Sequence, residues 1–238
     1  PNLLKGEFSE NVGTNVDSWS MRQPLGVVAG ITPFNFPAMV PMWMFPIAIA
    51  CGNTFILKPS EKDPSCPLRL AELLKEAGLP DGVFNLVMGS GREVGETLCT
   101  SSDIQAVTFT GSVEVGRRIA RNAIENMARV QLEMGSKNAL VVLNDADIDT
   151  AVQCAVSGAF FGTGQKCTAS SRIIVESGIH DKFVSKMTDA MANLVNELSL
   201  LAKTLDGETR TYTDALKSIT TSKNQSAAIL SSLTDSKD

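Results

Sequence analysis

Short apolar runs alternate with helical patterns along this chain from about residue 26 to residue 196. The expected strands are 26–31, 54–57, 83–88, 106–109, 130–134, 139–143 and 172–175. The expected helices are 38–52, 68–77, 93–98, 113–124, 148–161 and 181–194. This alternation predicts an α/β fold in which helices cover both faces of a mostly parallel sheet. Ligands of such folds bind at the carboxyl ends of the strands, so residues that follow strands are candidate site residues.

The composition favours a folded protein with no affinity for nucleic acid or membranes. The 238 residues suit one large domain or two smaller ones, and 43% of them are hydrophobic, which is ample for a core. The net charge is −5 and the basic residues are scattered, so nothing favours a nucleic-acid partner. The most apolar stretch, 38–52, is too short to span a bilayer and contains Pro41 and Pro46, so we expect a buried helix. The sequence shows no secretory signal, and because it begins at Pro1 rather than Met we expect an upstream piece.

The cysteines indicate a reducing compartment and single out one thiol. They show no paired spacing, and His180 is the only histidine, so a disulfide scaffold, a zinc site and Ser-His-Asp chemistry are poor hypotheses. A cytoplasmic location fits best. Cys167 lies in a polar, glycine-containing segment, 162–172, where a substrate can reach it, and it is a candidate covalent nucleophile. Its alternative interpretation is a small buried hydrophobic residue. The other cysteines lie in or beside apolar stretches: Cys51, Cys66, Cys99 and Cys154.

Five short motifs follow expected strands or begin expected helices. They are PFNFP (33–37), GNTFILKPSE (52–61), FTGSVEVG (109–116), LEMGSKN (132–138) and GQKCTASSR (164–172). In their order and approximate spacing they resemble the aldehyde dehydrogenase superfamily, over roughly residues 20–196. The resemblance implies a Rossmann-type parallel sheet flanked by helices, with the beginning of a second α/β catalytic domain.

The resemblance also implies a set of catalytic residues. Cys167 would attack the aldehyde carbon, and Asn35 and the backbone N–H of Cys167 would hold the developing oxyanion. Glu133 would be the general base, and we expect partial desolvation of its carboxylate beside Met134 and Gly135. The alternatives are a turn residue between two prolines for Asn35 and an exposed charge at a strand end for Glu133.

For the cofactor, the resemblance places the adenosine ribose against Lys58 and Glu61. A 2′-phosphate would meet the like charge of Glu61, so NAD is preferred, with NADP as the alternative because Lys58 softens that repulsion. The turn at Gly111 and Ser112 would bind pyrophosphate at a helix N-terminus, although the segment lacks the GxGxxG fingerprint. Further candidates for the cofactor groove are Thr32, Pro33, Phe34, Ser60, Gly91, Gly95, Phe109, Val115 and Gly135. Lys58 and Glu61 also fit an ordinary surface ion pair, and Gly91 and Gly95 fit simple turn residues.

Two parts of the chain resemble different subfamilies. Residues 24–65 resemble methylmalonate-semialdehyde dehydrogenase, which passes its acyl group to coenzyme A. Residues 102–185 resemble hydrolytic enzymes of the α-ketoglutarate-semialdehyde type. Because Glu133 is retained, we expect oxidation of a small semialdehyde acid to a free carboxylate. Acyl transfer to coenzyme A is one alternative, and a catalytically silent nucleotide-binding module is another.

The resemblance suggests an NAD-binding domain at 1–134, lacking its N-terminal part, and the start of a catalytic domain at 135–198. The polar tail 199–238 has no assignment beyond weak helical patterns at 215–219 and 227–233. The distal family motifs are absent, so half of the substrate pocket is missing. Uncovered sheet edges would then favour a homo-oligomer or a larger assembly.

Overall fold

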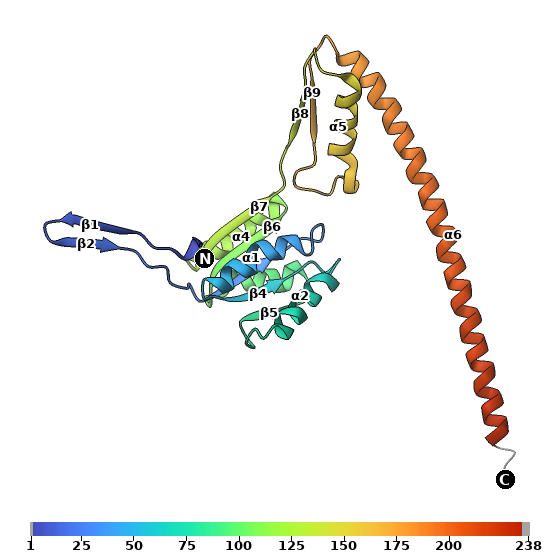
Figure 1. Ribbon diagram of the computed structural model, residues 1–238, viewed down its shortest axis with the longest axis horizontal. Helices are drawn as coiled ribbons and strands as arrows, with labels where there is room; N and C mark the ends of the chain where they lie inside the picture. The colour runs from blue at the N-terminus through green and yellow to red at the C-terminus, as the bar shows by residue number, and fades with distance from the viewer. Residues whose placement is uncertain (1, 235–238) are drawn as a thin grey trace. The chain divides into compact units, whose positions relative to one another are not determined.

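The computed structural model describes the backbone of residues 2–234 and the side chains of Asn2 and residues 4–209. The described chain forms two compact units (Figure 1). The first contains the residues up to Asn138 and the segment Gln165–Ala169, and the second contains Ala139–Gly164 and the residues from Ser170 onward. The segment that carries Cys167 therefore belongs to the first unit, whereas the sequence placed it with the residues after 134.

The first unit is built on a five-stranded sheet in the order β5-β4-β3-β6-β7, with every neighbouring pair parallel. Its strands are β3 (Val27–Ile31), β4 (Thr54–Lys58), β5 (Phe84–Leu86), β6 (Ile104–Gly111) and β7 (Arg129–Met134). From β3 the chain adds β4 and β5 on one side, and then returns to add β6 and β7 on the other. The predicted parallel sheet is confirmed, and its order reverses between β3 and β6.

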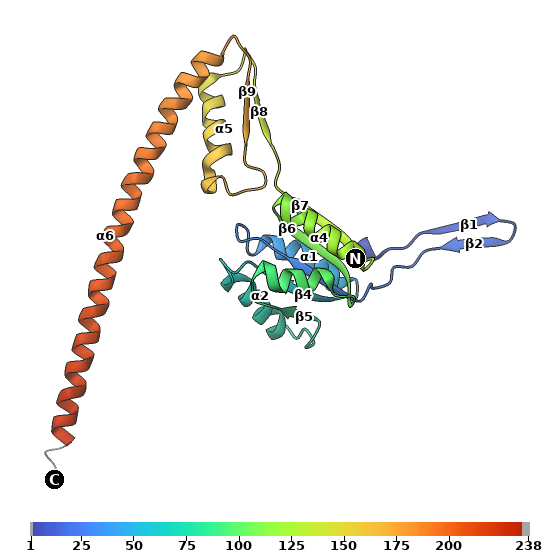
Figure 2. The ribbon, with the colours of Figure 1, turned by 180° about the vertical axis from the view of Figure 1, so that it is seen from behind.

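Helices cover both faces of this sheet (Figures 1 and 2). On one face, α1 (Met39–Ala50) and α2 (Ser65–Glu76) pack on a cluster that includes Val28, Phe55 and Leu57. On the other, α3 (Glu96–Thr100) and α4 (Val113–Glu125) pack on Ala29, Val107 and Phe109. A π-helical turn, Gly91–Gly95, leads into α3. Because successive strand residues point to opposite faces, Val28 and Ala29 supply different cores from adjacent positions.

A hairpin near the N-terminus was not predicted from the sequence. A 3₁₀ turn (Asn2–Leu4) precedes it, and its strands β1 (Phe8–Gly13) and β2 (Val16–Trp19) pair only with each other. All of their residues are exposed, so the strands lack the alternation of apolar and polar residues that marks a half-buried strand. Asn11 and Asn15 have φ values of 53° and 59°, a conformation that asparagine tolerates better than most residues.

The second unit pairs β8 (Ala139–Val142) with β9 (Arg172–Val175) in parallel. Its helices are α5 (Ile148–Phe160), followed by the 3₁₀ turn Phe161–Gly164, and α6 (His180–Thr234). Val142, Val152, Ala155, Phe183 and Met187 form its core.

Helix α6 differs from the sequence prediction, which ended a helix at residue 194 and assigned no structure to most of the polar tail. The structure has one continuous helix to Thr234, and residues 235–238 of the tail lie outside the described residues. No proline interrupts this stretch, and residues 198–205 contain the strong helix formers leucine, alanine and lysine. Helix propensity therefore extends the helix beyond the residues that the second unit's core covers.

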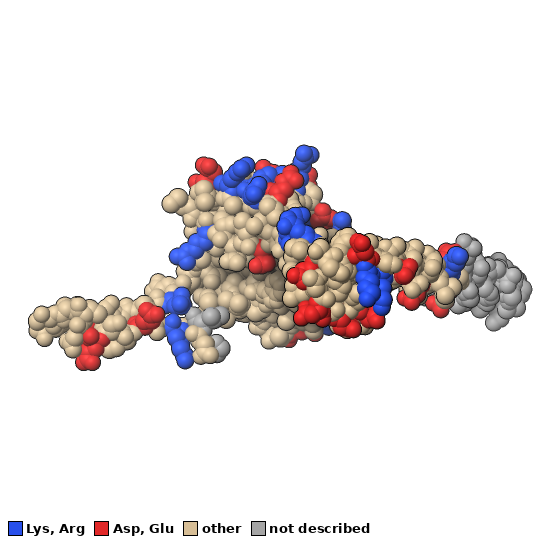
Figure 3. Space-filling view, turned by 90° about the horizontal axis from the view of Figure 1, so that it is seen from above, with Lys and Arg blue, Asp and Glu red and all other residues tan. Residues whose placement is uncertain are grey.

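The surface carries both signs of charge. On the face shown in Figure 3, acidic and basic side chains are interspersed. Among the described residues, no helix combines the length and the apolar character needed to cross a bilayer.

The burial of Leu57 in the sheet core predicts how strongly its truncation destabilises the first unit. Leu57 is fully buried in β4, so Leu57→Ala should lower the free energy of unfolding of the first unit by about 2–5 kcal/mol. Urea unfolding followed by Trp43 fluorescence, in a Trp19→Phe background, measures this change. Leu68→Ala on α2 is the matched control because Leu68 is 42% exposed, and it should cost under about 1 kcal/mol. Equal effects of the two substitutions would contradict the packing described above.

Candidate functional site

The loops that follow β3, β4, β6 and β7 lie at one edge of the sheet, because the strands are parallel and in register. Most candidate residues of the first unit follow these strand ends. The turns are also joined to one another: Thr32 N–H donates to the carbonyl of Lys58 at 3.1 Å, and Gly135 N–H donates to the carbonyl of Gly111 at 3.3 Å. Backbone hydrogen bonds thus join these loops in two pairs, the loops after β3 and β4 and those after β6 and β7.

Lys58 and Glu61 form an ion pair at the end of β4. The Lys58 ammonium is buried, and donates to the Pro59 carbonyl at 2.9 Å and to Glu61 Oε2 at 3.0 Å. The Glu61 side chain is 59% exposed. A hydrogen bond to its own backbone N–H, then the hydrogen bond from Lys58 and the charges of Lys58 and Lys62, hold the pKa of Glu61 below the usual glutamate value. At neutral pH its carboxylate is therefore ionised and can accept hydrogen bonds from a ligand.

A second contact joins the loops after β3 and β4. The Lys62 ammonium lies 4.9 Å from the centre of the Phe34 ring, in a cation–π arrangement. Ser60 Oγ accepts a hydrogen bond from Lys62 N–H at 3.2 Å. Thr32 is buried between these loops, and its Oγ1 has no hydrogen-bond partner among the described residues. Pro33 and Phe34 follow it and are half-buried.

The turn after β6 depends on Gly111. A Cβ at this position would lie 2.5 Å from the Phe109 ring, which is too close for any side chain. Ser112 caps α4 by accepting from Val115 N–H at 3.4 Å, so the first turn of this 13-residue helix opens at the sheet edge. Phe109 itself is buried in the core, so its ring is held in place against Gly111. Gly135 has open space where a Cβ would be.

Gly91, Gly95 and Val115 share one small cavity of about 40 Å³, which Ile31 also lines. A Cβ on Gly91 would meet nothing within 4 Å, so no steric contact requires glycine there. Ser90 begins the π-helical turn by accepting a hydrogen bond from Glu93 N–H at 3.1 Å. The structure therefore brings these three candidates together.

The cysteine segment is tied to the loop after β3. Asn35 Nδ2 donates to the carbonyl of Gln165 at 2.8 Å, across 130 residues of sequence. Asn35 Oδ1 is buried and has no hydrogen-bond partner among the described residues. An amide nitrogen carries two N–H donors, so this bond leaves Asn35 a second one. Asn35 thus lies beside the segment of Cys167.

Asn138 fixes Cys167 itself, a role that sequence analysis did not give it. Its Nδ2 donates to the carbonyl of Cys167 at 2.8 Å and to that of Ala169 at 3.4 Å, and its Oδ1 accepts from Ser136 Oγ at 3.0 Å. Asn138 ends the LEMGSKN motif, so the motif carried the signal, but only the fold places its amide against Cys167.

The five cysteines differ in environment. Cys167 is half-buried in its hydrogen-bonded segment, and Cys154 is exposed on α5. Burial raises the pKa of Cys99 to about 11, so that thiol is protonated at neutral pH.

Glu133 occupies the second-last position of β7, opposite Thr110 of β6. Its side chain is exposed, whereas Leu132 and Met134 on either side are half-buried against the core. The expected partial desolvation of this carboxylate is therefore wrong for the described residues. The reason is the strand alternation, which turns Glu133 away from the core face that its neighbours cover.

The sheet and its helices define a doubly wound α/β domain, and comparison with known proteins defines its family. The profile of the aldehyde dehydrogenase family matches residues 2–207, and the chain belongs to this family. Malonate-semialdehyde dehydrogenase of Pseudomonas aeruginosa is 50% identical over 188 residues, which are 79% of this chain and 38% of that protein. An acylating, mitochondrial methylmalonate-semialdehyde dehydrogenase of Arabidopsis thaliana is 51% identical over 172 residues, covering 72% of this chain and 28% of that protein.

Solved structures agree with this assignment. Methylmalonate-semialdehyde dehydrogenase from Oceanimonas doudoroffii matches with a TM-score of 0.76 and 52% identity, over 81% of this chain and 40% of that one. Betaine aldehyde dehydrogenase from Staphylococcus aureus, crystallised with NAD⁺, matches with a TM-score of 0.76 and 38% identity, over 79% of this chain and 37% of that one. The expected aldehyde-dehydrogenase fold is confirmed. The chain spans about two fifths or less of the length of these relatives.

The Asn138 hydrogen bonds predict how fast the backbone amides of the cysteine segment exchange with solvent. Asn138→Asp keeps the side-chain shape but removes the N–H donors to the Cys167 and Ala169 carbonyls. Because one hydrogen bond contributes about 1 kcal/mol, amide hydrogen exchange in residues 165–169 should become roughly fivefold faster or more. Asn85→Asp, which removes a comparable bond to Gly82 at 2.8 Å, is the control and should leave this segment unchanged. Unchanged exchange in Asn138→Asp would show that the amide does not hold Cys167.

Proposed function

We propose that the protein containing this chain oxidises a small semialdehyde acid with NAD as hydride acceptor, through a covalent adduct on Cys167. The observation that supports this most is the attachment of the Cys167 segment to the sheet edge by Asn35 and Asn138. The names of the relatives support the substrate class, because they act on malonate and methylmalonate semialdehydes.

The residues at the edge fit a dinucleotide. The ionised Glu61 carboxylate, oriented by Lys58, would accept the ribose hydroxyls, and the N-terminus of α4 at Ser112 would bind the pyrophosphate. Gly111 lies where a side chain would collide with Phe109, and Gly135 leaves open space beside that turn. Thr32, Phe34, Gly91, Gly95 and Val115 would complete the groove. When bound, NAD supplies the acceptor for the hydride that leaves the substrate carbon.

The chemistry of the chain's own residues would begin at Cys167. Its thiolate attacks the aldehyde carbon, and the carbonyl oxygen becomes an oxyanion. The remaining N–H of Asn35 and the backbone N–H of Cys167 stabilise that charge, which appears only as the bond forms. Asn138 keeps the segment in place during this step through the Cys167 carbonyl. Lys166, directly before the nucleophile, would orient the carboxylate of a semialdehyde acid.

Loss of a hydride from the adduct carbon to the bound acceptor would leave a thioester on Cys167, and this thioester needs an acceptor for its acyl group. Glu133 would remove a proton from water, and the hydroxide formed would release the acid and regenerate the Cys167 thiolate. Exposure of Glu133 keeps water within its reach. Acyl transfer to coenzyme A is the second candidate, favoured by the acylating relative from Arabidopsis thaliana. The aligned length is 188 residues for the Pseudomonas aeruginosa relative and 172 residues for the Arabidopsis thaliana relative. The similarity to semialdehyde dehydrogenases is therefore not confined to residues 24–65.

Apolar side chains left exposed in the second unit indicate that the active protein contains more than this chain. Val141, Leu143 and Ile174 are between 52% and 60% exposed around its two-stranded sheet. The relatives are more than twice as long, and further residues would be needed to cover these side chains and to complete a substrate pocket. Location in the cytoplasm is proposed from the unpaired cysteines.

The nucleophile is tested in the full-length protein that contains this chain. Cys167→Ser should lower the rate of NADH formation from malonate semialdehyde by roughly a thousandfold or more, because the hydroxyl is a far weaker nucleophile. Binding of NAD, measured by calorimetry, should change less than about twofold, since the thiol does not hold the dinucleotide. Cys154→Ser is the control and should keep the full rate. Retained activity in Cys167→Ser would refute the assignment, and NAD binding without NADH formation by the unaltered full-length protein would favour a silent nucleotide-binding module.

Substitution of Glu133 tests whether water or coenzyme A accepts the acyl group. Glu133→Gln should slow release of free acid by about 10²–10⁴-fold, while the first turnover of NADH persists. Addition of coenzyme A to the unaltered chain should leave the yield of free acid unchanged. Conversion of the product to an acyl-coenzyme A would overturn hydrolysis and favour the second candidate.

Glu61 governs the cofactor preference. Glu61→Gln should weaken NAD binding by about tenfold or more, since hydrogen bonds to a charged acceptor are the stronger ones. It should also narrow the preference for NAD over NADP, because the like-charge repulsion is removed. Glu72→Gln, which alters a pair with Arg69 in which both side chains are exposed, should change neither the NAD nor the NADP dissociation constant. Equal NADP binding before and after Glu61→Gln would contradict this role.

A further inference from the structure

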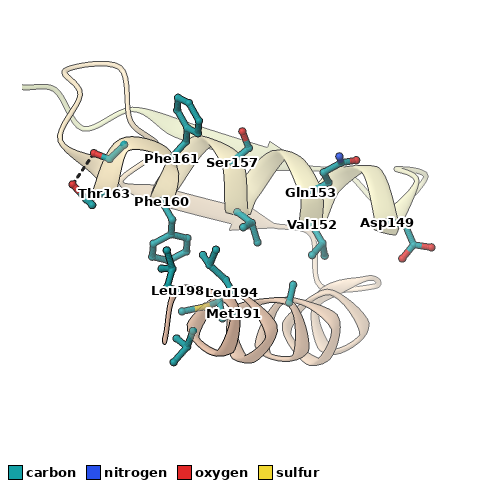
Figure 4. A pocket seen from close by; sticks show the side chains of 14 residues that line it. Asp149, Val152, Gln153, Ser157, Phe160, Phe161, Thr163, Met191, Leu194 and Leu198 are labelled. Carbon is teal, nitrogen blue, oxygen red and sulfur yellow. Dashed lines mark hydrogen bonds between the residues drawn. The ribbon is translucent and has the colours of Figure 1, made fainter. Parts of the chain in front are cut away.

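An apolar groove of about 970 Å³ lies between α5 and α6 in the second unit. Phe160 of α5 and Met191 and Leu194 of α6 are among the residues that line it (Figure 4). The chain spans about two fifths of its relatives, and an apolar lining alone does not define what covers the groove. The first unit holds a more specific contact, between the Lys62 ammonium and the Phe34 ring.

Lys62 and Phe34 join the loops that follow β4 and β3. The Lys62 ammonium lies 4.9 Å from the centre of the Phe34 ring, and Ser60 Oγ holds the Lys62 backbone by accepting from its N–H at 3.2 Å. At the strand ends themselves, Thr32 N–H donates to the Lys58 carbonyl at 3.1 Å. The two loops are therefore joined twice, once by backbone at the sheet and once by side chains further along each loop.

The Lys62 side chain is directed to the ring rather than to an acid. Glu61 precedes it and Asp63 follows it, yet among the described residues Lys62 forms no ion pair. Lys58 is the lysine that pairs with Glu61. A cation held over an aromatic face is attracted by the negative charge density of the ring, so this contact restrains both side chains.

Phe34 belongs to a loop that has few other restraints. Backbone hydrogen bonds hold this loop at Thr32 and again from Phe36 onward, and none among the described residues involves 33–35. Phe34 is half-buried and directly precedes Asn35, whose amide reaches the cysteine segment. The position of the Phe34 ring therefore bears directly on the position of the Asn35 amide.

We propose that Lys62 is a positioning residue, which holds the Asn35 amide in place through its contact with the Phe34 ring. This role rests on the function proposed above, in which Asn35 stabilises the oxyanion. That charge appears only as the bond to Cys167 forms, so a displaced donor lowers the rate of bond formation and leaves the affinity for the aldehyde unchanged.

Lys62→Gln tests this role in the full-length protein that contains this chain, because glutamine keeps an unbranched stem and removes the charge. In a single turnover with saturating NAD and aldehyde, NADH formation should slow about two- to fivefold, the factor that an exposed cation–π contact supports. The half-saturating aldehyde concentration should stay within about 1.5-fold. Lys62→Arg keeps a cation over the ring and should retain the rate. Lys75→Gln, at an exposed lysine that pairs with Asp81, is the matched control and should also retain it.

A double-mutant cycle and hydrogen exchange isolate the contact with the ring. In a Phe34→Leu background, Lys62→Gln should have no further effect on the rate, because the contact is already lost. In the otherwise unaltered protein, Lys62→Gln should quicken amide exchange in residues 33–38 by about two- to fivefold. The exchange measurement needs no turnover, so it tests the contact even in a protein that forms no NADH, a result that would count against the proposed function instead.

Unchanged exchange in residues 33–38 would overturn the proposal. So would equal slowing by Lys62→Gln with and without the Phe34 ring, or a loss of rate in Lys62→Arg. An unchanged rate combined with weaker NADP binding in Lys62→Gln would also overturn it, and would assign the ammonium to a 2′-phosphate.

Discussion

Two side-chain amides, those of Asn35 and Asn138, hold the cysteine segment in the first unit. Each donates to a backbone carbonyl at 2.8 Å, one at Gln165 and the other at Cys167 itself. The chain on both sides of this segment belongs to the second unit. The fold therefore ties the segment that carries the Cys167 thiol to the loops after β3 and β7 through contacts between residues more than 25 positions apart.

The parallel sheet supplies the edge to which that segment is tied. Strand order reverses between β3 and β6, and in folds of this class ligands bind at the carboxyl ends of the strands where such a reversal occurs. Thr32, Lys58, Gly111 and Gly135 all follow strand ends, and two backbone hydrogen bonds connect their loops in pairs. Membership in the aldehyde dehydrogenase family is consistent with this placement.

Local pattern predicted the sheet and its helices well, since buried strands and amphipathic helices carry clear periodicities. It missed the β1–β2 hairpin, because strands exposed on both faces have no such alternation. It also missed the role of Asn138, because a contact between positions 138 and 167 is set by tertiary structure. The exposure of Glu133 follows from which face of β7 is covered, which a sequence window around one residue does not record. The continuity of α6 was underestimated because the residues beyond 205 are mostly polar, so helix propensity rather than a clear apolar period extends the helix.

The most direct measurement is the mapping of a covalent adduct. The chain is incubated with NAD and a semialdehyde acid, quenched in acid, digested and analysed by mass spectrometry. We expect an acyl group on the peptide that contains Cys167, formed only when NAD is present, because the thioester requires prior oxidation of the adduct. An acyl group on a different cysteine, or one whose formation does not depend on NAD, would contradict the assignment of Cys167 as the nucleophile.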